Sequence, residues 1–501
     1  MKKIFSISAI FVLLVVSSCS NELDNINTNP NDMERGSIHP ASILPNALFY
    51  GAEAFTKLSY NLAGEIIQYT VSANTLDAYH RYQIPNGVSG GVWNNCARWG
   101  ANADHMIELA QKDPTRQNFE AIGLTLRAYY MQILTDSFGD APFKEAFKTV
   151  DGKTHPAFDL QKDIYLQLIE DLRKANSLYD MNHPMTESQA NKDFLYYGNL
   201  ARWQKFTNSL LMRVLMRCSG CSEINSAEQL REIYNNPATY PIFASEEDAA
   251  IYRYTGVDGN LNPYGSTDVT TFNSSRRAAE FIIDLMRDSG DPRISLYFVQ
   301  VGGAWRGAKS GVANRDDGGL STAARLNKAI LGDYNSPFSF MNYDEVLFIW
   351  AEAAQRSMIP GGEGLAEEYY RKAVEASVRH WSSMPGNDTA VTDLAIKQFL
   401  QKIPYDGTYE QLMTQKFVAL FWCGFEAWAE YRRTDYPSLT IAPTTMNDHI
   451  LPRRFGYPVN TASTNPDNYN LILNHLRKDY AGDDDMKTPV WWSKYRIEHY
   501  N

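Results

Sequence analysis

A short stretch of the sequence alternates aromatic rings with polar side chains. It contains Asp77, Tyr79, Arg81 and Tyr82. Aromatic rings pack against the apolar faces of sugar rings, whereas carboxylate, amide and guanidinium groups form hydrogen bonds with sugar hydroxyls. This mixture predicts non-covalent binding of a ligand such as an oligosaccharide. The alternative is that the rings only hold a loop against the core.

Two other places offer the same combination of side chains. Trp93 and Asn94 follow the first stretch closely, and Trp305 lies in a distant Gly-rich segment. All three fall in stretches rich in Gly, Asn, Pro and aromatic residues, which we expect to be loops: about 74–99, 252–275, 298–340 and 434–492. Long loops in a compact chain are uncommon and usually functional. We therefore expect the candidate residues to converge at one loop-rich face.

Catalytic motifs are weak in this sequence. Gly87 to Gly91 matches G-x-S-x-G around Ser89, but a nucleophile elbow needs a buried strand before the serine, and Tyr82 to Asn86 does not form one. The sequence contains no H-E-x-x-H and no P-loop motif. We expect no enzyme activity, no cofactor and no metal. A glycosidase that uses two carboxylates is the alternative, because acidic residues are plentiful.

Two further motifs carry weaker signals. Cys218 and Cys221 form a C-x-x-C pair at the end of an expected helix, but no flanking strand or matching second pair follows. We expect a structural thiol pair or a disulfide. The acidic run from Asp483 to Asp485 has the oxygen ligands that Ca²⁺ prefers. We favour a solvated acidic loop there.

The N-terminus has the pattern of a secretion signal followed by a lipid attachment site. Lys2 and Lys3 precede an apolar run, Ile4 to Val16, that is shorter than the roughly 20 residues of a membrane-spanning helix. Small residues then precede Cys19, as in a bacterial lipobox. We expect Cys19 to carry acyl chains that anchor the mature protein in membrane lipid, outside the cytoplasm.

The chain is expected to have three parts. Residues 1–18 are the expected signal peptide, residues 19–36 form a polar, lipidated tether, and residues 37–501 form one globular body. The formal net charge of −11 argues against a nucleic-acid partner, because such proteins usually present a broad basic surface.

Apolar residues recur every three or four positions through most of the body, which predicts a mainly α-helical fold. The clearest helices are expected around residues 44–69, 119–133, 164–175, 203–214, 276–289, 343–357, 364–381 and 409–433. Pro360 and Gly361 separate two of them, as in a helical hairpin. This pattern is typical of stacked tetratricopeptide-like hairpins, although no clean 34-residue period is present.

Taken in order along the chain, several segments resemble the SusD/RagB-like outer-membrane lipoproteins. These segments are the lipobox with Leu23 to Asn31, Thr135 to Phe143 (TDSFGDAPF), Trp350 to Ala354 (WAEAA), Gln415 to Arg433, Arg453 to Pro458 (RRFGYP), and Trp491 with Trp492. The resemblance spans the chain.

This resemblance implies a helical fold with tetratricopeptide-like hairpins and a loop-rich, irregular half that binds the ligand. It implies an outer-membrane lipoprotein that faces the cell exterior, binds oligosaccharides and delivers them to a SusC-like, TonB-dependent barrel. A peptide-binding uptake lipoprotein of the same family is the alternative. We expect the helix around Glu426 to Arg433 to organise the fold and not to contact the ligand.

Overall fold

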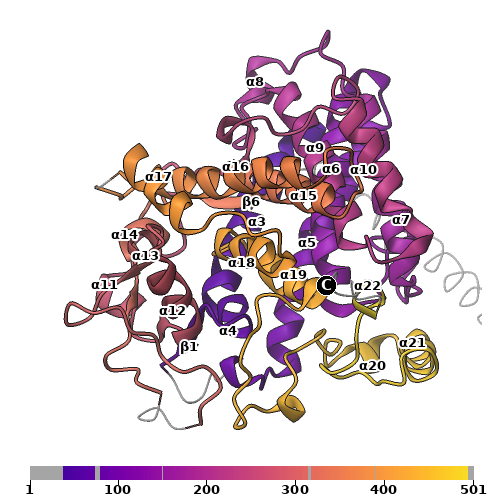
Figure 1. The fold of residues 1–501 in the computed structure, drawn as a ribbon. Coiled ribbons are helices and arrows are strands. Elements are labelled where there is room, and N and C mark those ends of the chain that lie inside the picture. The colour runs from indigo at the N-terminus through magenta and orange to yellow at the C-terminus, as the bar shows by residue number, and fades with distance from the viewer. Residues whose placement is uncertain (1–37, 74–78, 149–150, 314–317, 389, 495–501) are drawn as a thin grey trace, which may run out of the picture.

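The protein is mainly α-helical, as predicted (Figure 1). The computed structural model describes residues 38–73, 79–148, 151–313, 318–388 and 390–494. The expected signal peptide, Cys19, the tether and Asp77 lie outside these residues. No helix among the described residues has the length and apolar character that crossing a membrane requires.

Helices supply most of the ordered elements. They are α3 (Leu44–Leu58), α4 (Gly64–Ile66), α5 (Asn86–Ala110), α6 (Gln117–Phe138), α7 (Gln161–Leu178), α8 (Glu187–Ala190), α9 (Leu200–Arg217), α10 (Ser226–Asn235), α11 (Val269–Phe272), α12 (Glu280–Ser289), α13 (Ile294–Tyr297), α14 (Lys328–Leu331), α15 (Tyr343–Gln355), α16 (Gly362–Ser382), α17 (Asp393–Lys402), α18 (Tyr409–Ala419), α19 (Glu426–Thr434), α20 (Thr461–Thr464), α21 (Pro466–Asp479) and α22 (Trp491–Lys494). A π-helical turn, η2 (Ser59–Ala63), joins α3 to α4, and a 3₁₀ turn, η3 (Tyr79–Arg81), precedes α5.

Neighbouring helices pack as hairpins in the half of the molecule that contains α5 to α10, α15 and α16 (Figure 1). The pairs α5 with α6, α6 with α7, and α15 with α16 form this stack. The last pair is separated at Gly361, whose φ of +126° a side chain would rarely allow. The predicted tetratricopeptide-like hairpins are therefore confirmed.

Within the described ranges, three short two-stranded antiparallel sheets connect distant segments. They pair β1 (Thr70–Ser72) with β3 (Arg276–Ala278), β2 (Ala250–Tyr252) with β6 (Phe338–Met341), and β4 (Phe298–Val299) with β5 (Arg325–Leu326). In the first sheet Thr70 lies opposite Ala278 and Ser72 lies opposite Arg276. This sheet joins α4 to the start of α12 in the loop-rich half.

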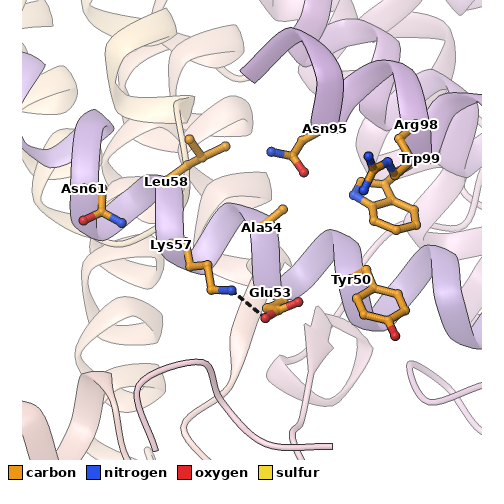
Figure 2. A pocket seen from close by; sticks show the side chains of 9 residues that line it. All are labelled: Tyr50, Glu53, Ala54, Lys57, Leu58, Asn61, Asn95, Arg98 and Trp99. Carbon is orange, nitrogen blue, oxygen red and sulfur yellow. Dashed lines mark hydrogen bonds and ion pairs between the residues drawn. The ribbon is translucent and has the colours of Figure 1, made fainter. Parts of the chain in front are cut away.

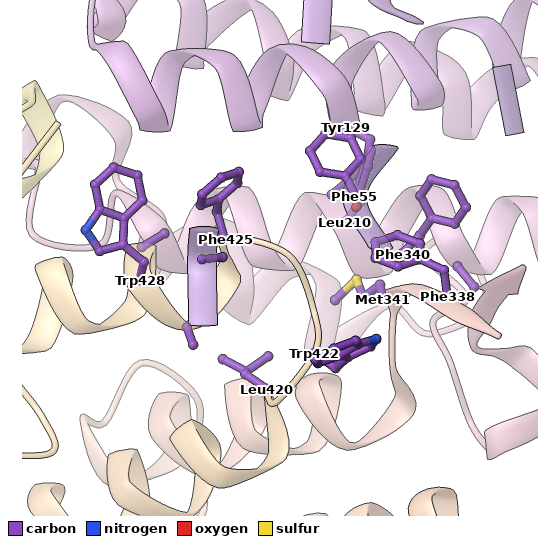
Figure 3. Close-up of a cluster of buried hydrophobic side chains, with 14 of the residues drawn as sticks. Phe55, Tyr129, Leu210, Phe338, Phe340, Met341, Leu420, Trp422, Phe425 and Trp428 are labelled. Atoms are coloured by element: carbon purple, nitrogen blue, oxygen red, sulfur yellow. The ribbon is translucent and has the colours of Figure 1, made fainter. Parts of the chain in front are cut away.

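The core lies where the helical half meets β6 and the chain between α18 and α19 (Figure 3). Figure 3 draws side chains from α3, α6, α9, β6, the α18–α19 connection and α19, among them Phe55, Tyr129, Leu210, Phe340 and Trp428. Burial of such large apolar side chains supplies the main driving force for folding.

A cluster of buried charges connects α19 to three other helices. The Arg433 guanidinium lies 2.5 and 2.7 Å from the two Glu352 oxygens and 2.6 Å from Glu430. Glu430 also accepts from Lys416 at 2.5 Å and lies 3.3 Å from Arg217. Although burial opposes its ionisation, the cations Arg433, Lys416 and Arg217 hold the pKa of Glu430 well below its usual range.

Arg432, which precedes Arg433 in α19, contacts the other segments that carry the family resemblance. Its guanidinium lies 3.7 Å from the centroid of Trp428 and 4.9 Å from that of Trp492. It donates to the backbone carbonyls of Asp136 at 2.6 Å and Arg453 at 2.8 Å. These segments therefore hold the fold together, as expected for α19.

The structure corrects four boundaries. The predicted loop at 74–99 contains the start of α5, which begins at Asn86 because burial of Val92 and Cys96 outweighs the low helix propensity of its glycines. The expected helix at 276–289 begins only at Glu280, after β3. The helix at 409–433 is broken after α18, where Trp422 and Gly424 have φ of +66° and +62°. The predicted loop at 434–492 contains α21.

Candidate ligand-binding site

A cavity of about 550 Å³ lies in the loop-rich half, between one face of α12 and two loops. Phe281 and Leu285 line it from α12. The β4–β5 connection contributes Lys309, Ser310 and Val312, and the chain after α19 contributes Thr440 to Pro443. Gln68 also lines it, from the end of α4. The cavity falls within the size range of small-ligand sites.

The loops around this cavity are joined mainly through backbone groups. The Gly311 N–H donates to Nδ1 of His80 at 3.0 Å, and the Thr444 hydroxyl donates to the Gly311 carbonyl at 2.6 Å. The Met446 N–H donates to the Arg81 carbonyl at 2.6 Å. Three segments far apart in sequence therefore form one frame.

Gly311 lies at a close approach of two of these segments. Its φ is +81°, and a Cβ placed there would lie 2.7 Å from both Ala442 Cβ and Thr445 Cγ2. Any larger residue would combine backbone strain with a steric clash. Glycine at this position permits the loops to meet.

Gln68 offers a hydrogen-bonding group on the cavity wall. Its side chain is only 4% exposed, and its φ of +58° is unusual for a residue other than glycine. Its Nε2 donates to the Thr440 carbonyl at 2.9 Å and lies 3.5 Å from the Tyr82 hydroxyl. No donor to its Oε1 is found among the described residues, so this oxygen is available to accept from a ligand hydroxyl.

The imidazole of His80, which contacts Gly311, is neutral. Burial, helped by the nearby charges of Arg81 and Arg276, lowers its pKa to about 4. A neutral imidazole keeps the Nδ1 lone pair that accepts from Gly311. The carboxylate of Glu65, which is fully buried, accepts from the backbone N–H of His80 at 2.9 Å and pairs with Arg276 at 2.9 Å.

The rim of the cavity carries more negative than positive charge. Glu280, Asp284 and Asp288 stand four residues apart on α12, with Lys309 across the cavity. Arg287 pairs with Asp284 at 2.7 Å and with Asp288 at 2.8 Å, which neutralises part of this charge. The rim therefore suits a neutral or cationic ligand better than an anionic one.

Of the first group of predicted residues, the structure describes Tyr79, Arg81 and Tyr82, which lie on or next to η3, beside the loops of this cavity. Tyr79 is half-buried in η3, and Arg81 donates to the Thr444 carbonyl at 3.3 Å. Tyr82 differs from the prediction: it is 1% exposed, so its ring packs in the core and cannot stack on a ligand in this arrangement. Its hydroxyl lies 3.5 Å from Nε2 of Gln68.

The other predicted residues are divided between two places. The chain runs from Trp305, which is half-buried, to Gly307, which lies against the backbone of Ala279 and Glu280 beside the cavity. Trp93 and Asn94 lie on α5 and not in a loop. The Trp93 ring packs edge-on against Phe138 and Tyr457 and at a tilt against Phe158, while Asn94 is exposed. The prediction that all the candidates converge therefore holds only in part.

Sequence reasoning missed the side chains that form most of the wall. Phe281 and Leu285 are four residues apart and lie beside the core-facing residues Ile282, Ile283 and Met286. Their signal was an apolar pair on a helical face that otherwise carries the carboxylates Glu280, Asp284 and Asp288. Gln68 gave no signal, because its role depends on a backbone conformation that its sequence context does not reveal.

The remaining motifs have structural roles. Ser89 lies in the first turn of α5, and its hydroxyl donates to the Asn86 and Gly456 carbonyls, so the G-x-S-x-G match forms no nucleophile elbow. Cys218 and Cys221 are buried free thiols, which excludes the disulfide alternative.

The acidic run has partners within the protein. Asp483 lies 3.2 Å from Arg477, and Asp484 accepts from Arg454 at 3.2 Å and from the Tyr457 N–H at 2.9 Å. Asp485 accepts from the Lys487 and Thr488 N–H groups. Within the described ranges, no group of acidic, histidine or cysteine side chains has a geometry that would hold a metal ion.

Comparison with known proteins identifies the same architecture in solved structures. A chitin-binding protein superimposes with a TM-score of 0.78 at 22% identity, over 91% of this chain and 99% of that one. A SusD homologue from Bacteroides fragilis gives 0.76 at 23% identity, over 91% and 99%. One from Parabacteroides distasonis gives 0.76 at 21% identity, over 92% and 99%. Among curated proteins, none matches this sequence.

A family model matches residues 30–458, which is most of the chain. The description of that family is "Starch-binding associating with outer membrane". This match supports carbohydrate binding in association with the outer membrane. The chain belongs to the SusD-like family.

Proposed function

We propose that this protein binds neutral oligosaccharides in the cavity between α12 and the loops at 309–312 and 440–443. The observation that carries the proposal is the combination in one cavity of an apolar surface, Phe281 and Leu285, with the Oε1 atom of Gln68, which has no donor among the described residues. A sugar ring presents an apolar face and hydroxyl donors to match these groups. The negative rim disfavours anionic ligands.

The test is binding by calorimetry to a panel of neutral oligosaccharides: malto-, chito- and xylo-oligosaccharides. Phe281→Ala should weaken binding of the cognate ligand about three- to tenfold, because a stacked ring contributes about 0.5–1.5 kcal/mol beyond its area burial. Tyr197→Ala serves as the control, because Tyr197 is an exposed aromatic residue outside the cavity. Thermal unfolding of both variants establishes that they are folded. Unchanged affinity in a folded Phe281→Ala protein would place the site elsewhere.

The same incubation separates binding from hydrolysis. We expect every oligosaccharide to be recovered intact by chromatography after overnight incubation. Shorter products that are formed by the purified protein, and not by a buffer control, would favour the glycosidase alternative and reject a pure binding function.

We further propose that the protein is anchored by lipid at Cys19, faces the cell exterior and delivers its ligand to a TonB-dependent barrel. The lipobox and the family match support this assignment. Cys19→Ala should move the protein from the membrane pellet to the supernatant without altering its fold. Wild-type protein extracted in detergent should purify with the barrel, and its isolation without such a partner would count against delivery.

A peptide ligand is the second candidate, and the carboxylates of Glu280, Asp284 and Asp288 favour it if the peptide is basic. A lysine-rich peptide would then bind more weakly as salt concentration rises, whereas binding of a neutral sugar would not change. Failure of basic peptides to bind at low salt removes this candidate.

A further inference from the structure

A second cavity, of about 510 Å³, lies between α3 and α5 (Figure 2). It is lined by Tyr50, Glu53, Ala54, Lys57, Leu58, Asn61, Asn95, Arg98 and Trp99. None of these residues lines the cavity beside α12. The lining combines aromatic, amide and charged groups, which is unlike an ordinary groove between two helices.

One end of this cavity is an aromatic platform. The rings of Tyr50 and Trp99 stack with their centroids 5.5 Å apart and their planes within 6° of each other. Trp99 is buried, whereas Tyr50 is 43% exposed. The buried indole fixes the tyrosine ring, so that little conformational freedom would be lost when a ligand packs on it.

The charges on the wall are not balanced. Glu53 accepts from Lys57 at 2.6 Å, so these two side chains neutralise each other. The Arg98 guanidinium lies 5.9 Å from the Trp99 ring centroid, and it has no acidic partner in the described part of the chain. A guanidinium group recognises carboxylates through paired hydrogen bonds.

Amide groups complete the wall. Asn95 extends from α5 between the aromatic platform and Leu58, as Figure 2 shows. Its Nδ2 donates to the Gly91 carbonyl at 2.8 Å. Asn61 lies at the other end, on the π-helical turn η2, a type of distortion that is common at functional sites.

We infer that this cavity is a second saccharide site, specific for a sugar residue that carries a carboxylate, such as a uronic acid. The pyranose ring packs on Tyr50, its carboxylate pairs with Arg98, and its hydroxyls bond to Asn95. The inference rests on the proposed saccharide-binding function. It assigns the acidic sugar to a site separate from the cavity beside α12, whose rim repels anions.

The test uses the full chain in detergent and tetragalacturonic acid as the probe. Its methyl ester keeps the same rings and removes the charge, and a sulfated galactan tetrasaccharide supplies a different anion. We expect binding of the acid only, lost with increasing salt. Arg98→Gln should weaken it at least tenfold, and Tyr50→Ala about three- to tenfold, with Tyr50→Phe close to wild type.

Two controls separate this site from the first. Arg371→Gln removes an exposed arginine on α16 and should leave binding unchanged. Phe281→Ala should weaken binding of the neutral oligosaccharide and leave binding of tetragalacturonic acid unchanged. Absence of tetragalacturonate binding, equal binding of the ester, or binding of the sulfated probe in its place overturns the inference. If the wild-type protein binds tetragalacturonate but none of the neutral oligosaccharides, the proposed function of the first cavity is rejected and this inference stands.

Discussion

The buried charge cluster around Arg433 and the cavity beside α12 use charged and polar groups in opposite ways. In the cluster, each charge is buried and faces an opposite charge within about 3 Å. At the cavity, carboxylates stand exposed on a rim, and the Oε1 atom of Gln68 has no donor among the described residues. In this protein the paired buried charges stabilise the fold, whereas polar groups on the cavity surface remain available to a ligand.

The largest expected effect comes from breaking the cluster. Arg433→Ala leaves Glu352 and Glu430 buried without their main partner, so we expect the free energy of unfolding to fall by about 3–5 kcal/mol. Urea unfolding measures it. Arg371→Ala, which removes an exposed arginine 3.9 Å from Glu367, should cost less than about 1 kcal/mol. Equal effects of the two variants would remove the distinction between the regions.

The helical half should lose stability as pH rises. Burial raises the pKa of Asp344 to about 7, so the folded state holds a proton that the unfolded state has released above its ordinary value of 3.8. The protonated state therefore favours folding most strongly at low pH, and this advantage disappears as pH rises through about 7. His380, which pairs with Glu246, has a raised pKa and acts in the same direction.

Urea unfolding of wild type and Asp344→Asn at pH 5 to 8 isolates this effect. The variant cannot ionise at this position, so its stability relative to wild type should increase with pH. A constant difference across this range would show that Asp344 does not titrate in the folded state.

The loops that are joined around Gly311 should instead lose stability as pH falls. The pKa of His80 is lowered to about 4 in the folded state, whereas it is about 6.5 in the unfolded state. Between these values the unfolded state binds a proton that the folded state does not, so the free energy of unfolding falls as pH falls from about 6.5 to 4. The shift corresponds to a contribution on the order of 3 kcal/mol, and protonation removes the acceptor for Gly311.

Stability against pH for His80→Gln tests this assignment, because a glutamine oxygen can accept from Gly311 without titrating. Below pH 6 the variant should lose less stability than wild type does. Parallel profiles for the two proteins would show that His80 is not the group responsible.

The smallest effect is expected at Gly311. Gly311→Ala should lower the free energy of unfolding by about 1–2 kcal/mol for the left-handed backbone alone, and more if Ala442 cannot move. Gly259→Ala is the matched control, because Gly259 has a φ of +85° with open space around it. Ligand affinity should fall only in the Gly311 variant. Equal affinities would show that this close approach does not shape the cavity.

Much of the helical half could be predicted because its signal is local. The apolar residues of α6, α7, α9, α15 and α16 recur at helical spacing, and each helix buries that face. The prediction for α5 was wrong because Gly87, Gly90 and Gly91 suggest a loop, whereas packing against neighbouring helices decides the structure there.

The site was less predictable because it depends on contacts between distant segments. Composition singled out Tyr79 and Arg81, which lie on η3 beside the loops of the cavity. Tyr82 has the same composition signal, but its φ of +61° turns the side chain into the core. Residue type cannot distinguish a ring that faces a ligand from one that supports the wall.

The joining of loops through main-chain atoms has an evolutionary consequence. The contacts of Gly311, Thr444 and Met446 with their partners use backbone amides or carbonyls on at least one side. Every residue type supplies a carbonyl, and every type except proline supplies an amide, so these contacts tolerate mutation of many flanking positions. Substitution of side chains such as Phe281, Leu285 and Ile441 could then alter specificity without breaking the contacts that join the loops.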